Sequence, residues 1–211
     1  QLPAAAEDID LFAPLPRDES GRPNVLIILD NTANWNDAFT REKAALVNTF
    51  DGLPLDEFNV GLMFFGAPET GYVRAAIRPM DATNRPLYSA MIANLHRTND
   101  AGNARTLART FSEAYRYLNG LDSVAPSVQT GSPHNTKRDY SNNTAGNASD
   151  DAVHARPGNA LASSSAYRYQ RPATMEDCAG TFIIYIGNTV SGGNVTKDNS
   201  SRNSAAGSEL E

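Results

Sequence analysis

Residues 25–29 (VLIIL) form an uninterrupted apolar run of strand length that ends in Asp30. A strand without polar alternation is typical of a sheet covered on both faces. Residues 60–65 and 181–186 repeat the pattern, and the second of these runs lies between Gly180 and Gly187. The sequence therefore predicts a central strand at residues 25–29 and a second buried strand at residues 181–186.

Helical periodicity fills the intervals between these runs. Phe39, Leu46 and Phe50 fall on one face of a helix expected at residues 37–50, which a Gly-Leu-Pro sequence then ends. Two further amphipathic helices are expected around residues 87–95 and 107–118. Residues 72–78 partly alternate apolar and charged side chains, which predicts a half-exposed edge strand paired with residues 60–65. Helices placed between strands indicate an α/β fold, a doubly wound, Rossmann-like, mostly parallel sheet with an antiparallel edge strand.

Composition excludes several classes of function. The net charge is −6, and Lys and Arg do not cluster, which argues against a nucleic-acid partner. No apolar run approaches the roughly 20 residues that cross a bilayer. Cys178 is the single cysteine, and we interpret it as a packed side chain. A catalytic thiol would need a histidine partner, but the three histidines, His96, His134 and His154, lie in polar sequence where none is placed to activate it.

The chain is expected to fold as one domain over residues 24–205, after a polar leader or linker at 1–23 and before a tail at 206–211. Residues 121–171 are rich in Ser, Asn, Thr, Gly and Asp and have no regular period, so they predict a long surface insertion. Its tyrosines, Tyr140, Tyr167 and Tyr169, are candidates to anchor it locally.

The candidate metal-ligating side chains lie directly after the first expected strand. Asp30, Thr32 and Asn34 place a carboxylate, a hydroxyl and an amide oxygen at alternating positions, so a short loop can turn them toward one point. Ligands of doubly wound sheets bind at the carboxyl ends of strands, where Asn188 would join this loop from the later strand. Mg²⁺ prefers oxygen ligands and keeps some waters, and Thr106 is our candidate for a further hydroxyl. The alternative is that these short polar side chains bond the backbone of their own loop.

These residues carry a resemblance. The Asp-x-Thr-x-Asn sequence at Asp30 resembles the Asp-x-Ser-x-Ser signature of the metal-ion-dependent adhesion site in von Willebrand factor A domains. In order along the chain, further blocks are similar to the N-terminal domain of the PilC/PilY family of type IV pilus proteins, namely residues 29–35, 59–63, 105–107, 114–117 and 182–188, with Cys178 before the last. The resemblance covers roughly residues 8 to 205. It implies a von Willebrand factor A-like domain in an exported protein at the pilus tip, cell surface, outer membrane or periplasm.

The chain departs from that pattern at two ligand positions. Asn34 stands where the signature has Ser, and Asn188 stands where the family usually has Asp. Loss of a carboxylate weakens the affinity of a site for a hard divalent cation, so the resemblance implies a degenerate site for Mg²⁺, or for Mn²⁺ or Ca²⁺, at Asp30, Thr32, Asn34, Thr106 and Asn188. Trp35 follows the motif and is a candidate for the binding rim, with packing on the first helix as its alternative.

The expected function is non-enzymatic: a binding and adhesion module that acts in pilus biogenesis, surface attachment and surface sensing. Its expected partners are pilus subunits or minor pilins and a host or abiotic surface ligand, with association through an incomplete sheet edge. A first alternative is a metal-free structural domain that caps or spaces an adhesin. A second is a magnesium-dependent phosphatase with Asp30 as nucleophile, which lacks the expected acid at Thr32 and a lysine in the candidate loops.

Overall fold

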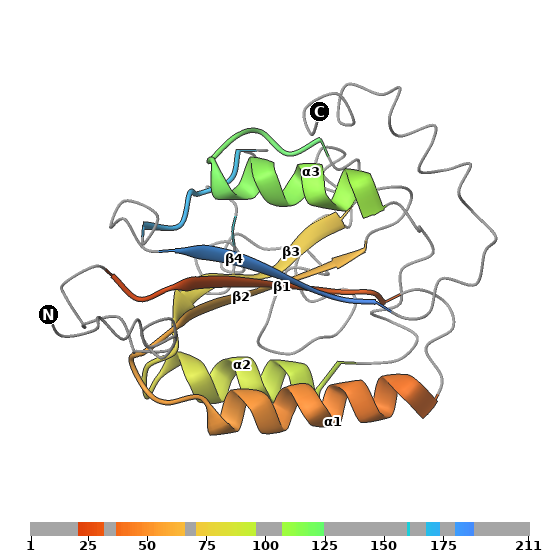
Figure 1. Cartoon of the computed structure of the whole chain (residues 1–211), viewed down its shortest axis with the longest axis vertical. Helices are drawn as coiled ribbons and strands as arrows, with labels where there is room; N and C mark the ends of the chain where they lie inside the picture. The colour runs from red at the N-terminus through yellow and green to blue at the C-terminus, as the bar shows by residue number, and fades with distance from the viewer. Residues whose placement is uncertain are drawn as a thin grey trace, which may run out of the picture.

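The computed structural model describes residues 21–31, 37–65, 71–95, 107–124, 160, 168–173 and 180–187. Within them, three helices and four strands follow one another in the order β1, α1, β2, β3, α2, α3, β4 (Figure 1). Their bounds are β1 Asn24–Leu29, α1 Asp37–Gly52, β2 Asn59–Phe65, β3 Gly71–Pro79, α2 Asn84–Ala93, α3 Leu107–Leu118 and β4 Thr181–Ile186.

The strands form one mixed sheet in the order β3-β2-β1-β4. β1 pairs in parallel with β2 on one side and with β4 on the other, and β3 is antiparallel to β2. The predicted α/β class, the central position of β1 and the antiparallel edge strand are therefore confirmed. The helix expected at residues 37–50 is also confirmed as α1, which ends at Gly52.

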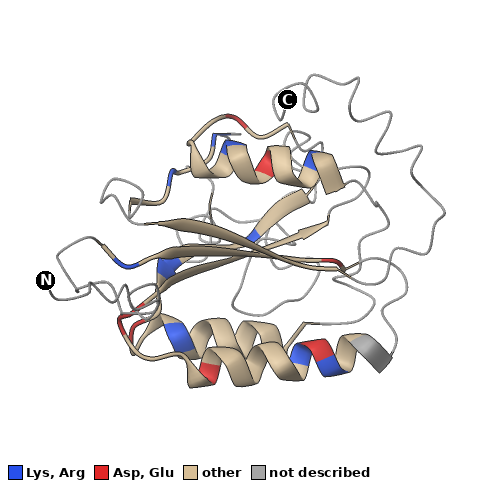
Figure 2. Ribbon diagram, viewed as in Figure 1, with Lys and Arg blue, Asp and Glu red and all other residues tan. Residues whose placement is uncertain are grey.

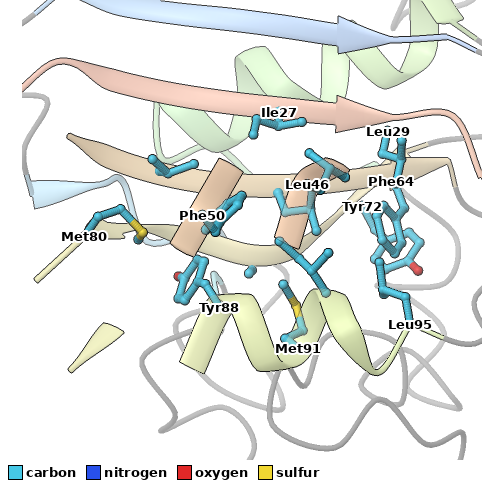
Figure 3. Packing of buried hydrophobic residues seen from close by; sticks show 14 of the residues in the cluster. Ile27, Leu29, Leu46, Phe50, Phe64, Tyr72, Met80, Tyr88, Met91 and Leu95 are labelled. Atoms are coloured by element: carbon cyan, nitrogen blue, oxygen red, sulfur yellow. The ribbon is translucent and has the colours of Figure 1, made fainter. Parts of the chain in front are cut away.

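The helices cover the sheet in two layers. α1 and α2 lie against one face and α3 lies against the other (Figure 1). On the first face, Phe50 of α1 stacks on Tyr88 of α2 with ring centroids 6.3 Å apart. Figure 3 shows these side chains converging with Leu46 of α1, Met91 of α2 and side chains of the strands, among them Ile27, Leu29 and Phe64. On the second face, Ala114 and Tyr117 of α3 pack on the opposite side chains of β1, Leu26 and Ile28.

β3 is an edge strand whose backbone is irregular, because its register against β2 shifts twice. Such bulges leave backbone groups without ladder partners. Tyrosines from both helical layers supply partners: the hydroxyl of Tyr88 donates to the carbonyl of Ala76, and the amide of Ile77 donates to the hydroxyl of Tyr117 at 2.7 Å. Gly61 of β2 lies opposite, where a Cβ would come within 2.7 Å of the Ile77 side chain. The two helical layers therefore fix this edge of the sheet.

Two sequence expectations about exposure are wrong. β3 is not half-exposed: residues 71–77 are buried, and this includes the charged Arg74. β4 is not buried, since 57% of Phe182, 38% of Ile183 and 48% of Ile184 are exposed. β4 is the other edge of the described sheet, and no described helix has more than slight contact with it. An apolar run indicates a strand but does not reveal whether a second layer covers it.

The described ends of the insertion expected at 121–171 pack on α3. Tyr169 is buried, its ring lies 5.5 Å from the ring of Tyr117, and its amide donates to the carbonyl of Leu121 at 3.1 Å. The anchoring role predicted for Tyr169 is confirmed, whereas Tyr140 and Tyr167 lie outside the described residues. Cys178 and the three histidines also lie outside them.

Charged side chains are sparse on the strands. Figure 2 shows β4 without any Lys, Arg, Asp or Glu, while charges lie along the three helices, on β3 and at strand ends. No helix in the described portion is both long and apolar enough to cross a membrane.

Candidate functional site

Asp30 occupies the carboxyl end of β1. The last pair in the parallel register of β1 and β4 is Leu29 with Ile186. One residue further along the chain, the amide of Asp30 donates to the carbonyl of Ile186 at 2.9 Å. This bond continues the ladder by one residue, so the backbone of Asp30 is held by the sheet rather than by its loop. Asp30 is 8% exposed and the following Asn31 is fully buried. A carboxylate in so closed a position costs free energy unless hydrogen bonds or an opposite charge stabilise it.

Tyr185 of β4 is a donor to this carboxylate. Its hydroxyl lies 3.5 Å from Oδ2 of Asp30, which is at the long end of hydrogen bonding. The ring is held edge-on by Phe65 and tilted against Phe111, with centroids 6.2 and 6.4 Å away. A Cβ on Gly187 would come within 2.7 Å of the same ring, so the chain passes directly beside it. One neighbouring strand and one helix therefore position the Tyr185 ring, because Phe65 ends β2 and Phe111 belongs to α3.

A second carboxylate faces Asp30 from α1. The pKa of Glu42 is raised above its ordinary value, first because the side chain is partly buried and second because the negative charge of Asp30 lies nearby. Two acids that repel one another create a region of negative potential. A divalent cation, or a protonated partner group, would relieve this repulsion.

The start of α3 lies at the same end of the sheet. Phe111, in the first turns of α3, contacts Tyr185, and Figure 1 shows the N-terminal end of α3 on the same side of the molecule as the end of β1. Thr106 directly precedes this helix, and Asn188 directly follows Gly187, the last described residue after β4. In the sequence, Thr106 therefore adjoins the start of α3 and Asn188 follows the end of β4, and both of these element ends lie at the same end of the sheet as Asp30.

Of the predicted site residues, the structure describes only Asp30. Thr32, Asn34, Trp35, Thr106 and Asn188 lie outside the described residues, so their ligand and rim roles stay predictions. Among the residues that are described, no three His, Cys, Asp or Glu side chains gather in a group that could hold a metal ion. The donors at Asp30, which are carboxylate and phenol oxygens, nevertheless belong to the chemistry that hard cations prefer.

Lys43 matters for the phosphatase alternative, because that alternative needs a lysine to stabilise charge on the group that Asp30 attacks. Its ammonium donates to the carbonyl of Leu95 at 3.4 Å and lies 5.7 Å from the ring centroid of Phe39. These contacts hold the Lys43 ammonium between α1 and the end of α2.

Sequence reasoning missed Glu42 and Tyr185. Tyr185 is one aromatic residue in an apolar strand, and Glu42 is one acid on an amphipathic helix, so neither stands out by residue type. Gly187 was the available signal, since a glycine after a β-branched and aromatic run is typical of a close approach by another group.

No protein-family model matches the chain, and no curated protein is significantly similar to it. The geometry of the Asp30 edge therefore has to support a functional proposal by itself.

Proposed function

We propose that the chain is a non-enzymatic binding module whose working surface is the edge of the sheet at Asp30. In this proposal it has a von Willebrand factor A-like fold and belongs to an exported, type IV pilus-associated protein of the PilC/PilY kind. There it contributes to pilus biogenesis, surface attachment and surface sensing, in contact with pilus subunits and a surface ligand.

One observation carries the proposal. β1 and β4 run in parallel as direct neighbours, and Asp30 bonds to Ile186 at their carboxyl ends. Loops that leave two parallel strands at one edge bring their side chains to a common rim, which is where open α/β sheets bind ligands. The buried Asp30 carboxylate lies on that rim and gives it a fixed negative charge.

The proposed cofactor is Mg²⁺, with Mn²⁺ or Ca²⁺ as substitutes. Asp30 would provide the anionic ligand, and Thr32, Asn34, Thr106 and Asn188 would provide neutral oxygens. Glu42 supports the proposal, because the negative charge of Asp30 contributes to its raised pKa, so the two carboxyls are close enough to interact. A cation at Asp30 would be attracted by both carboxylates. Bound metal would leave a coordination position for a carboxylate of the partner.

Calorimetric titration of the chain with MgCl₂, MnCl₂ and CaCl₂ tests the metal-centred surface. We expect saturable binding by the wild-type chain and loss of it in Asp30→Asn. Asp51→Asn is the matched control, because Asp51 is an exposed carboxylate at the far end of α1. Equal binding by the wild type and Asp30→Asn, or no binding by the wild type, would remove the metal from the proposal.

The exposed β4 edge favours a second candidate, a metal-free structural domain that associates with a partner through this strand. Phe182 and Ile184 are exposed on a strand without charged residues, whereas the β3 edge is irregular and bonded to Tyr88 and Tyr117. An open, uncharged edge is a template for pairing with a further strand. If this candidate is correct, the chain still binds its partner after Asp30→Asn and no longer binds it when charges are placed on β4.

A further inference from the structure

Three arginines from separate parts of the sequence meet at the C-terminal end of α3. Arg116 belongs to the last turn of α3, whereas Arg168 and Arg171 belong to a segment that returns beside it. Nη1 of Arg116 donates to the carbonyl of Asp122 at 3.0 Å. Nε of Arg168 donates to the carbonyl of Gly120 at 3.0 Å, and a Cβ on Gly120 would lie 3.1 Å from the Cβ of Arg171. The three arginines therefore surround one turn of the chain.

Buried hydrogen bonds fix this arrangement from beneath. The carboxyl of Glu113, which is fully buried in the middle of α3, accepts a hydrogen bond from the hydroxyl of Tyr169 at 2.6 Å. The amide of Tyr169 donates to the carbonyl of Leu121 at 3.1 Å. Because Tyr169 lies between Arg168 and Arg171 in the sequence, these bonds hold the backbone of both arginines beside α3.

The guanidinium groups at this end of α3 still have donors to offer. Within the residues that the structure describes, the side chain of Arg168 bonds through Nε alone, and that of Arg171 makes neither a hydrogen bond nor an ion pair. Oδ1 of Asp122 lies 3.7 Å from Nε of Arg168, but both side chains are largely exposed, so this ion pair is weak. The terminal nitrogens of an arginine match the two oxygens of a carboxylate. Arg168 and Arg171 can therefore each bind a further carboxylate.

Exposed polar and aromatic side chains border these arginines. Tyr115 is 46% exposed, and Asn119, one helical turn further along, is also exposed. Figure 2 shows positive charge at this end of α3 and on the segment beside it. Arginine and tyrosine are enriched where proteins bind one another. We call this region the arginine surface and define it by Tyr115, Arg116, Asn119, Arg168 and Arg171.

Residues 1–20 of the same chain carry the complementary charge. They contain a single basic residue, Arg17, and five acids, Glu7, Asp8, Asp10, Asp18 and Glu19. They lead into Arg22 at the amino end of β1, and Figure 1 shows that end of β1 on the same side of the molecule as the C-terminal end of α3. The 12 residues from Asp10 to Arg22 span up to about 40 Å when extended, whereas packed layers lie about 10 Å apart. The acids are therefore within reach.

We propose that the arginine surface binds the acidic stretch at residues 7–10 of its own chain. The carboxylates of Glu7, Asp8 and Asp10 pair there with the guanidinium groups of Arg168 and Arg171. Individual exposed ion pairs are weak, but a flexible tether supplies an effective concentration on the order of millimolar, which favours the contact. This contact lies at the opposite end of α3 from Asp30 and needs no metal.

Other anionic partners fit the arginine surface less well. Nucleic-acid binding draws on several phosphate contacts, and attraction to an anionic membrane commonly uses about four to eight basic residues. The arginine surface has three arginines with Asp122 beside them, and the whole chain has a net charge of −6, which repels large polyanions. Its few charges match a short acidic stretch of polypeptide.

Amide NMR signals of the full isotope-labelled chain test the contact. In the triple variant Glu7→Gln, Asp8→Asn, Asp10→Asn, we expect the signals of Asn119, Arg168 and Arg171 to shift from their wild-type positions. Raising NaCl from about 0.01 to about 1 M shortens the Debye length from about 30 to about 3 Å, so it should move the wild-type signals the same way.

The matched control neutralises the acids nearest to Arg171 in the sequence, through Glu176→Gln with Asp177→Asn. It should leave the signals of the arginine surface in place. Unshifted signals in the triple variant, or equal shifts in the control, would overturn the proposal. The signal of Gly61 in the sheet should stay unchanged in every variant, which shows that the fold is retained.

A synthetic peptide of residues 1–12 supplies the acidic stretch from outside. Added to the triple variant at concentrations on the order of millimolar, it should return the signals of Asn119, Arg168 and Arg171 to their wild-type positions. The same peptide should have no effect when Arg168→Gln and Arg171→Gln are added to the triple variant. Restoration by phosphatidylserine vesicles or duplex DNA but not by the peptide would overturn the proposal.

Discussion

The amide of Asp30 donates to the carbonyl of Ile186 at 2.9 Å, and this single bond joins residues that lie at the ends of two strands far apart in the sequence. It extends a parallel ladder that begins with Asn24 opposite Thr181. The loop after β1 and the loop after β4 therefore start side by side. That relationship is what makes the Asp30 edge a candidate binding surface.

Tyr88→Phe and Tyr117→Phe should each destabilise the chain by about 1–3 kcal/mol, because each removes the hydroxyl that satisfies a buried backbone group of β3. Urea unfolding followed by circular dichroism measures the change. Since the two hydroxyls serve adjacent residues, Ala76 and Ile77, the double variant should deviate from additivity. If neither substitution changes the free energy of unfolding, water or other groups satisfy the backbone of the β3 bulge.

Gly61→Ala should destabilise by roughly 1–3 kcal/mol, because its Cβ would lie 2.9 Å from the backbone nitrogen of Ile77 and could not be accommodated by a side-chain rotation. Gly52→Ala is the control: a Cβ there meets nothing within 4 Å, and alanine is the better helix former. Unfolding free energies of the two variants should therefore shift in opposite directions. Equal effects would contradict the close approach of β3 to β2.

Glu42→Gln should stabilise the chain at pH 7 by less than about 1 kcal/mol, since solvent screens much of this side chain. The pKa of Glu42 is raised, so its favourable contribution is full below pH 4.5 and is lost as pH rises through the raised value. The variant and the wild type should therefore differ less at pH 4 than at pH 7 in urea unfolding. A difference that is the same at both pH values would contradict a raised pKa of Glu42.

Placing charges on β4 should prevent association without unfolding the domain. Phe182→Lys with Ile184→Lys alters two exposed side chains, so we expect little change in stability and a loss of any concentration-dependent self-association. Sedimentation velocity over a range of concentrations makes the measurement. Leu87→Lys, at an apolar side chain of α2 that is 39% exposed, is the matched control. A wild type that stays monomeric, or an equal effect of Leu87→Lys, would contradict a special role for β4.

Local pattern was sufficient for much of the fold. The apolar run before Asp30 predicted β1 as a central strand, and the spacing of Phe39, Leu46 and Phe50 predicted the buried face of α1. These features depend on periodicity and on glycine or proline at element ends, which a sequence displays directly.

Layer contacts and tertiary partners could not be predicted in the same way. Nothing in residues 181–186 distinguishes a strand covered by helices from an exposed edge, and the alternation around Arg74 suggested exposure where bulges and packing bury it. Glu42 and Tyr185 reach Asp30 from α1 and β4, so their proximity depends on how whole elements pack. Such neighbours become visible only in three dimensions.

The central claim is that a divalent cation binds at the carboxyl ends of β1 and β4. Paramagnetic Mn²⁺ titrated into the isotope-labelled chain broadens the amide signals of residues near its binding site. We expect the amides of Asn31 and Gly187 to broaden first, while those of Asn24 and Gly180, about 22–24 Å away at the opposite ends of the strands, persist. Broadening centred on any other part of the molecule, or unchanged broadening in Asp30→Asn, would contradict the claim.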